Sequence, residues 1–148
     1  MYRLKTRNQF QAVLAGSKLV SGTRFAVHYL AADTSSFRLA IGLSGPTEAR
    51  LSDPSTELWL GTMIPKRWAR RAVTRNAIKR QIYSVARDFE SRLPSGAWVV
   101  RLRSGFDRSQ FRSATSTALK DVVRSELVAL LTHVAHMSSL KPLQGLAK

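Results

Sequence analysis

The sequence predicts an α+β fold, a single small layered domain in which one small sheet is covered by helices in the order α-β-β-β-α-β-α. Two patterns predict this class. Apolar residues alternate along several short segments, as they do in strands. Elsewhere they recur at the intervals of three and four residues that are typical of amphipathic helices. A length of 148 residues with 44% apolar content is enough for one domain with a buried core.

The first helix is predicted at the N-terminus. A capping-box pattern, Thr6-x-x-Gln9, marks its start, and Gly16 marks its end. Residues 16–22 are expected to form a turn. A strand follows over residues 25–30, in which Phe25, Val27 and Tyr29 share one face and Ala26, His28 and Leu30 share the other.

Two further segments show strand-like alternation before the central helix. Residues 37–43 are expected to form the second arm of a hairpin with residues 25–30. Residues 44–57 contain two prolines and three acids, which indicates a surface loop or insertion. Residues 58–64 are another strand candidate, ended by Pro65.

The central helix is predicted from Ala72 onward, because the segment lacks Pro and Gly and has a helical apolar stripe. The stripe consists of Ile78, Ile82, Val85, Ala86, Phe89 and Leu93. Arg71 and Arg75 lie in line with it one and two turns earlier, so the first turns of the helix are expected to project past the edge of the core.

The C-terminal part predicts one more strand and one more helix. Pro94-Ser-Gly96 is expected to close the central helix, and residues 97–102 alternate as a strand. A long helix is predicted over residues 109–137. The domain is therefore expected to span residues 1–137, followed by a mobile tail at 138–148.

The most unusual feature is a run of seven cations between Lys66 and Arg80, with no acidic residue from Leu58 to Arg87. The whole chain has a net charge of +15. Such a charge predicts a polyanionic partner, with nucleic acid ahead of an anionic membrane. Cysteine is absent, which excludes disulfides and thiolate metal sites. Because no segment has the pattern of a signal peptide or membrane span, a cytoplasmic protein with no membrane association is expected.

Other functions fit the sequence less well. A protein-only nuclease would need clustered carboxylates or paired histidines, but the nine acids are scattered and the three histidines form no constellation. We therefore predict no catalytic and no metal-binding residue. A ribosomal or RNA-chaperone protein that binds structured RNA is the alternative, since it would explain the charge and the helix equally well. A DNA regulator would need a helix and a tight turn before the recognition helix, whereas strand-like segments precede the basic helix in this sequence.

The ordered string around the basic run resembles the signature of the bacterial ribonuclease P protein component. The string comprises Gly61–Ile64, Lys66-Arg67, Arg70-Arg71-Ala72, Arg75-Asn76 and Ile78-Lys79-Arg80. The similarity extends from about Leu4 to Leu131. Two positions depart from the family: Ala77 stands where Arg is usual, and Tyr83 where another Arg is frequent. Both 37–43 and 58–64 resemble the family's second strand.

The resemblance implies a role as protein cofactor of a large catalytic RNA. That RNA removes the 5′ leader of precursor tRNA with Mg²⁺ bound by the RNA, so no cofactor is expected on the protein alone and no protein partner is required. By resemblance, the residues that dock on the RNA are Lys66, Arg67, Arg70, Arg71, Arg75, Asn76, Lys79 and Arg80. The single-stranded leader would lie in a cleft between the first helix and the sheet.

The resemblance assigns Phe10, Phe25 and His28 to that leader cleft. The family often has a second Phe and a Tyr where this chain has Leu14 and His28, so weaker stacking is expected. From the residues alone, Phe10 and Phe25 are expected in the core rather than in a cleft, and His28 is expected to be partly exposed. Trp68 and Tyr83 fit two interpretations equally, stacking on bases or covering the edge of the helix.

Overall fold

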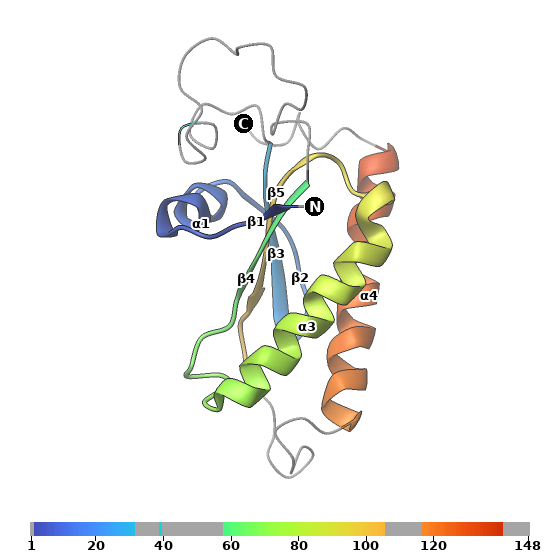
Figure 1. Cartoon of the computed structure of the whole chain (residues 1–148). Coiled ribbons are helices and arrows are strands. Elements are labelled where there is room, and N and C mark those ends of the chain that lie inside the picture. The colour runs from blue at the N-terminus through green and yellow to red at the C-terminus, as the bar shows by residue number, and fades with distance from the viewer. Residues whose placement is uncertain (1, 32–38, 40–57, 106–116, 141–148) are drawn as a thin grey trace.

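Five strands in the described part of the chain form one mixed sheet with helices on both faces (Figure 1). The computed structural model describes residues 2–31, 39, 58–105 and 117–140. The strands are β1 (Tyr2–Arg3), β2 (Ser17–Ser21), β3 (Phe25–Leu30), β4 (Leu58–Met63) and β5 (Gly96–Leu102). The helices are α1 (Arg7–Leu14), α3 (Ala72–Phe89), the short 3-10 helix η2 (Glu90–Arg92) and α4 (Thr117–Leu140). The predicted α+β class and the α-β-β-β-α-β-α order are confirmed, with the short β1 added in front.

The strands lie in the order β1-β4-β5-β3-β2. The central strand β5 pairs in parallel with β4 and antiparallel with β3. Parallel neighbours need a long connection, and α3 with η2 provides it between β4 and β5. At one edge β1 runs parallel to β4, with Tyr2 opposite Trp59.

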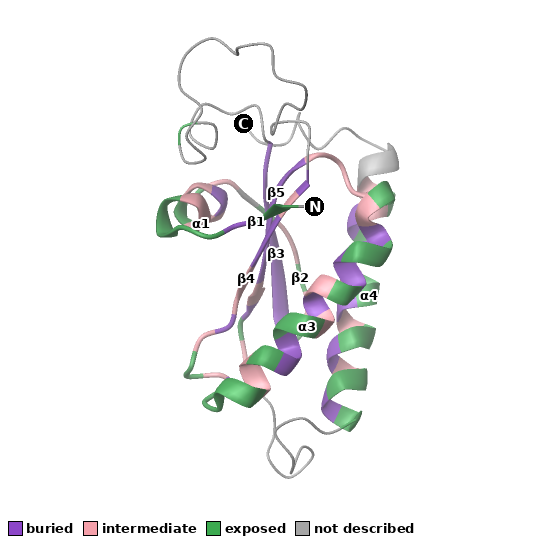
Figure 2. Cartoon of the chain, viewed as in Figure 1, coloured by how far each residue is buried: buried purple, intermediate pink, exposed green. Residues whose placement is uncertain are grey.

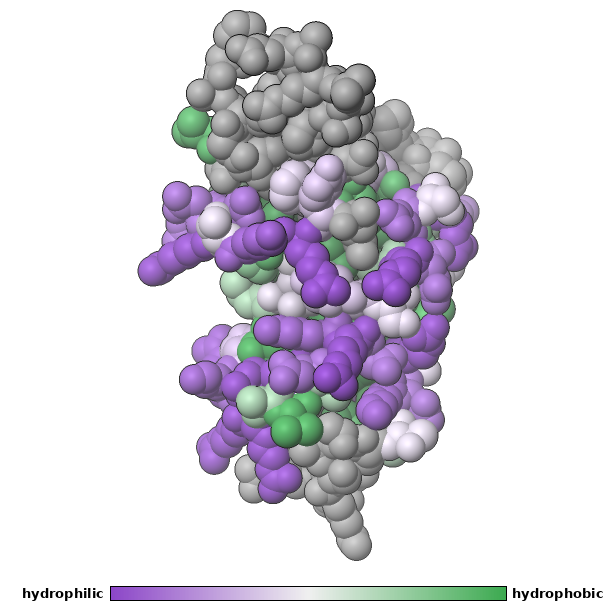
Figure 3. Space-filling model, in the orientation of Figure 1, coloured by the Kyte–Doolittle hydropathy of each residue, from purple (hydrophilic) through white to green (hydrophobic). Residues whose placement is uncertain are grey.

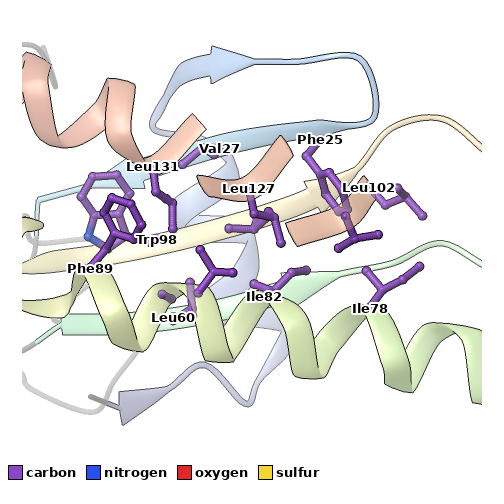
Figure 4. Packing of buried hydrophobic residues seen from close by; sticks show 14 of the residues in the cluster. Phe25, Val27, Leu60, Ile78, Ile82, Phe89, Trp98, Leu102, Leu127 and Leu131 are labelled. Atoms are coloured by element: carbon purple, nitrogen blue, oxygen red, sulfur yellow. The ribbon is translucent and has the colours of Figure 1, made fainter. Parts of the chain in front are cut away.

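The larger core lies between the sheet and the pair α3 and α4 (Figure 4). Figure 2 shows the buried residues along β3 and β5 and on the inner sides of both helices. Central strands buried on both faces and helices with one apolar stripe are the expected solution for such a layer. The α3 residues buried here are Ala77, Ile78, Ile82, Val85, Ala86 and Phe89, which confirms the predicted stripe within the helix.

A smaller core lies on the opposite face of the sheet, under α1. Its buried members are Leu4, Val13, Leu30, Ala97 and Val99. The predicted capping box fixes the start of α1, because the Gln9 backbone N–H donates to the Thr6 hydroxyl at 3.2 Å and the Gln9 side chain accepts from the Thr6 N–H at 3.2 Å. Among the described helices, α1 therefore lies on one face of the sheet and the two longer helices lie on the other.

Two strand predictions need correction. Residues 17–21, predicted as part of a turn, form β2, which pairs with β3. Since β5 pairs with the other side of β3, residues 25–30 have no free edge for a hairpin with residues 37–43. That segment lies outside the described residues except for Leu39, which is 69% exposed. Of the two candidates for the family's second strand, 58–64 forms β4 over residues 58–63.

The helix ends also differ from the predictions. The central helix ends at Phe89, and η2 follows it directly. Pro94-Ser-Gly96 therefore comes after η2 and does not close the helix. Leu93, the last residue of the predicted stripe, lies beyond the helix and is half-buried. The described part of the last helix begins at Thr117, and the predicted start at 109 lies outside the described residues. This helix continues to Leu140, three residues into the predicted tail.

Candidate nucleic-acid interface

A cluster of exposed polar and cationic side chains covers the N-terminal half of α3 and the turn before it. We call this cluster the basic surface. Its members are Lys66, Arg67, Arg70, Arg71, Asn76, Lys79 and Arg80, all exposed. Figure 3 shows hydrophilic side chains spread over this side of the molecule. The structure thus brings seven of the eight residues of the predicted docking set together in solvent.

The acids of the described ranges lie away from the basic surface. The described acids are Asp88, Glu90, Asp121 and Glu126, which lie at the end of α3, in η2 and in α4. The ion pairs Arg24–Glu126 at 3.8 Å and Arg124–Asp88 at 3.1 Å occupy other cations. Within the described ranges, no cation of the basic surface pairs with a carboxylate. A rigid, uncompensated array of this kind attracts phosphates and other anions.

Arg75, the eighth residue of the predicted docking set, has a different position. Its side chain is half-buried. The same guanidinium nitrogen, Nη1, donates to the carbonyl of Ala69 at 3.0 Å and to the carbonyl of Arg70 at 2.7 Å. The predicted projection past the core holds for the exposed Arg71, which is the N-cap residue of α3. The helix also projects at Arg75, since no residue of α3 before Ala77 is buried, but the Arg75 guanidinium folds back on the preceding turn and satisfies carbonyls there.

Two aromatic residues next to the cations cover the helix and its edge. Trp68 is half-buried against the larger core, and the Arg67 guanidinium lies 5.1 Å from its ring centroid. The Tyr83 ring has the Arg3 guanidinium 4.2 Å from its centroid. Both contacts are cation–π arrangements. For Tyr83, the contact favours the interpretation in which the ring covers the helix edge.

On the opposite face of the sheet, Phe10 lies directly over β4. A Cβ at Gly61 would be 2.5 Å from Cε1 of Phe10, so only a glycine allows the ring to approach the strand so closely. Phe10 is half-buried beside the smaller core. It therefore lies between α1 and the sheet, where the resemblance places the leader cleft.

The assignment of Phe25 to that cleft is wrong. Phe25 is fully buried in the larger core, under α3 and α4. Successive strand residues point to opposite faces, so Phe25 and Phe10 lie on different sides of the sheet. The position is a core position, as the residues alone had indicated.

His28 lies on the α1 face of the sheet but is not partly exposed as predicted, since only 7% of its surface is accessible. Arg101 of β5 donates from Nε to His28 Nε2 at 3.4 Å, while His28 Nδ1 is buried with no hydrogen-bond partner. Burial lowers the pKa of His28, and the positive charges of Arg101 and Lys18 lower it further. His28 is thus a neutral acceptor that holds Arg101, and its ring has little free surface for stacking.

Sequence reasoning missed two features on this face. Arg101 adds a half-buried cation, and Tyr2 stacks on Trp59 with ring centroids 4.7 Å apart and planes 21° apart. In the alternating segment 58–64, Trp59 lies on the opposite face of the strand from Leu58 and Leu60. A large aromatic residue there indicates that this second face also takes part in packing. Nothing local indicates that Tyr2 would pair with this strand.

The described part of the molecule has neither a metal-ligand cluster nor a membrane span. In these ranges, no group of three or more His, Asp or Glu side chains could hold a metal ion. None of the helices in the described ranges is long and apolar enough to cross a membrane. Fold and surface together define a class: a basic α+β protein with an exposed cationic face anchored on a hydrophobic core.

Comparison with known proteins identifies the family within this class. The family model described as ribonuclease P matches residues 1–126. The ribonuclease P protein component of Bordetella parapertussis is 36% identical over 133 residues, which cover 90% of this chain and 91% of that protein. That of Paraburkholderia xenovorans is 40% identical over 83 residues, or 53% of this chain and 57% of the other. The chain belongs to the ribonuclease P protein component family, the protein subunits of an RNA-based endonuclease of tRNA processing.

Solved structures support the same fold. The ribonuclease P protein of Thermotoga maritima superposes with a TM-score of 0.58 at 20% identity, covering 90% of this chain and 97% of that one. The Staphylococcus aureus protein gives a TM-score of 0.57 at 20% identity and covers 93% and 95%. At this level of identity the likeness concerns the fold alone. It extends over nearly the whole length of each chain.

Proposed function

We propose that the basic surface binds the catalytic RNA of ribonuclease P, and that the face between α1 and the sheet binds the 5′ leader of precursor tRNA. In this function the protein holds the RNA and the leader in place in the cytoplasm. The Mg²⁺ ions that support cleavage are held by the RNA, and the protein contributes no cofactor, metal or catalytic group of its own.

The observation that supports RNA docking is the combination of exposure and rigidity in α3. Lys79 and Arg80 lie in solvent with no acidic partner among the described residues, while Ile78 and Ile82, on the other side of the same helix, are each only 1% exposed. Arg and Lys side chains held in a fixed array match the phosphates of a folded RNA, and Arg can contact them bidentately. A solvated surface without a partner would bring together like charges that repel one another.

Leader binding is supported by the position of Phe10. Single-stranded RNA is held by aromatic platforms flanked by cations, and the half-buried Phe10 has the exposed Lys5 and Arg7 in the segment that leads to it. Family membership also decides against the alternative of a ribosomal or RNA-chaperone protein.

Reconstitution tests this function. The full chain is combined with the ribonuclease P RNA of the same cell at low Mg²⁺, and cleavage of precursor tRNA is measured. We expect the protein to stimulate removal of the 5′ leader. We expect Phe10→Ala to weaken binding of leader-bearing precursor more than that of mature tRNA, because mature tRNA has no leader to contact Phe10.

Two controls make the result decisive. Phe10→Leu keeps an apolar contact over Gly61 and reports on packing alone, and thermal melts show whether each variant is folded. An absence of stimulation by the wild-type chain would refute the docking role. Equal loss of affinity for precursor and mature tRNA in Phe10→Ala would refute the leader role and assign Phe10 to folding.

A further inference from the structure

The stack of Tyr2 on Trp59 lies at the edge of the sheet, on the same face as Phe10. The two residues are direct partners in the β1–β4 ladder, and Trp59 packs beside the smaller core under α1. Tyr2 is 42% exposed and Trp59 is half-buried. An aromatic pair whose only task was to seal the core would be covered, but this one presents much of the Tyr2 ring to solvent.

Strand geometry places this stack in line with Phe10. Trp59 and Gly61 are two residues apart in β4, so they share one face and their Cα atoms are about 7 Å apart. The Phe10 ring lies on Gly61. The backbone N–H of Leu4 donates to the Leu60 carbonyl at 2.9 Å, which continues the parallel alignment of the N-terminal segment along β4. Tyr2 on β1, Trp59 on β4 and Phe10 of α1 over Gly61 therefore form a row of aromatic rings on one face of the sheet.

The segment that carries Tyr2 is held from both sides. Arg3, the next residue, points to the other face of the sheet, where its guanidinium lies over the Tyr83 ring of α3. This contact and the two-residue ladder fix the orientation of β1. Tyr2 is thus presented by a segment anchored on both faces, which lowers the entropic cost of stacking a ligand on it.

The charges around the row fit a nucleic acid. Lys5 and Arg7 follow in the same segment and are exposed, and Arg101 adds a cation on the same face of the sheet. Every described Asp or Glu belongs instead to α3, η2 or α4, on the opposite side of the sheet. Exposed aromatic rings among cations suit the bases and phosphates of a single strand, whereas an apolar protein partner would leave these cations without counter-charges.

We infer that the Tyr2–Trp59 stack is a second base-stacking subsite for single-stranded RNA, adjoining the Phe10 position and extending the leader-binding face toward the edge of the sheet. This inference rests on the leader role proposed above. Tyr2 offers its exposed ring to a nucleobase, Trp59 supports it from beneath, and Lys5 and Arg7 contact the phosphates beside it. The subsite recognises any base, because stacking on an aromatic ring does not depend on hydrogen bonds to base edges.

Binding of precursor tRNA to the reconstituted holoenzyme tests the subsite. Leaders are lengthened one nucleotide at a time, and each is compared with a version in which a single leader base is replaced by an abasic residue. We expect Tyr2→Ala to weaken binding of long leaders by at least about fivefold, the lower end for loss of a base-stacking aromatic. We expect no effect on the shortest leaders, nor on the long leader that lacks the base held by Tyr2.

Matched variants separate stacking from packing. Tyr2→Phe keeps the ring and should bind like wild type, and Trp59→Leu should share the defect of Tyr2→Ala. Val128→Ala removes an apolar residue of similar exposure, 38%, from α4 and should have no effect.

If Phe10→Ala impairs leader binding but Tyr2→Ala does not, the subsite is refuted and the leader role stands. If neither has an effect, the leader role fails as well. Equal losses for all leaders with a lower melting temperature would make the stack purely structural.

Discussion

Arg75 uses its guanidinium inside the protein, whereas Lys79 and Arg80 on the same helix hold theirs in solvent. The two hydrogen bonds from Arg75 to the carbonyls of Ala69 and Arg70 connect α3 to the turn that carries Lys66 and Arg67. Hydrogen bonds from charged groups are among the stronger ones. Arg75 therefore supports the basic surface by fixing its turn, even though sequence grouped it with the exposed cations.

Substitutions should separate these roles. We expect Arg75→Ala to lower the free energy of unfolding by about 1–3 kcal/mol, because the carbonyl contacts are lost. We expect the double variant Lys79→Ala with Arg80→Ala to keep its stability within about 0.5 kcal/mol and to bind the catalytic RNA more weakly. Urea denaturation and a filter-binding assay measure the two quantities. Weaker RNA binding by Arg75→Ala at unchanged stability would instead make Arg75 a direct RNA contact.

At the scale of elements, α1 makes one of its closest contacts with the sheet at a glycine in β4. Phe10 of α1 rests on Gly61, and the space for a methyl group at this position is already filled by Cε1 of Phe10 at 2.5 Å and by a Leu4 methyl at 2.9 Å. The Phe10 ring can therefore lie this close to the strand only while residue 61 has no side chain.

Gly61→Ala should displace Phe10 and α1 from the sheet. We expect a loss of about 1–3 kcal/mol in unfolding free energy, the usual range for overpacking a filled site, together with weaker discrimination between precursor and mature tRNA. Gly105→Ala is the matched control, because its Cβ would be 3.6 Å from the Trp68 ring and needs no rearrangement. Unchanged stability and discrimination in Gly61→Ala would show that α1 is not held by this contact.

The whole molecule has an uneven charge distribution. Its net charge is +15, and the described acids are confined to the end of α3, η2 and α4. Among the described residues, the basic surface and the α1 face therefore carry cations and no carboxylate. Association with RNA should be driven in part by the release of counterions from the phosphates. The association constant should therefore fall as the salt concentration rises.

A salt titration of RNA binding tests this distribution. We expect the logarithm of the association constant to fall linearly with the logarithm of the salt concentration, with a slope of about −0.7 to −0.9 for each phosphate neutralised. Removing Lys79 and Arg80 should make the slope shallower by about 0.7–0.9 for each residue that contacts a phosphate. A flat titration of the wild-type chain would contradict an interface built on phosphate contacts.

The sequence alone determined the elements whose patterns are local. The capping box of α1, the buried stripe of α3, the uncompensated cations and the alternation of β3 all depend on residues a few positions apart. That alternation already placed Phe25 and His28 on opposite faces. Local spacing thus predicted the fold class and the buried stripe of α3. The resemblance supplied the docking set, seven members of which are exposed, and identified the family that the comparisons bear out.

Only the tertiary structure decided which segments meet. It pairs β2 with β3, sets Tyr2 on Trp59 and turns Arg75 back onto its own turn. It also puts α1 over the face that carries His28, so that Phe25 lies under α3 and α4 in the core. The physical reason is that strand pairing and helix placement are set by burial between segments far apart in the chain. A local pattern shows which side of a segment is apolar, but not what will cover it.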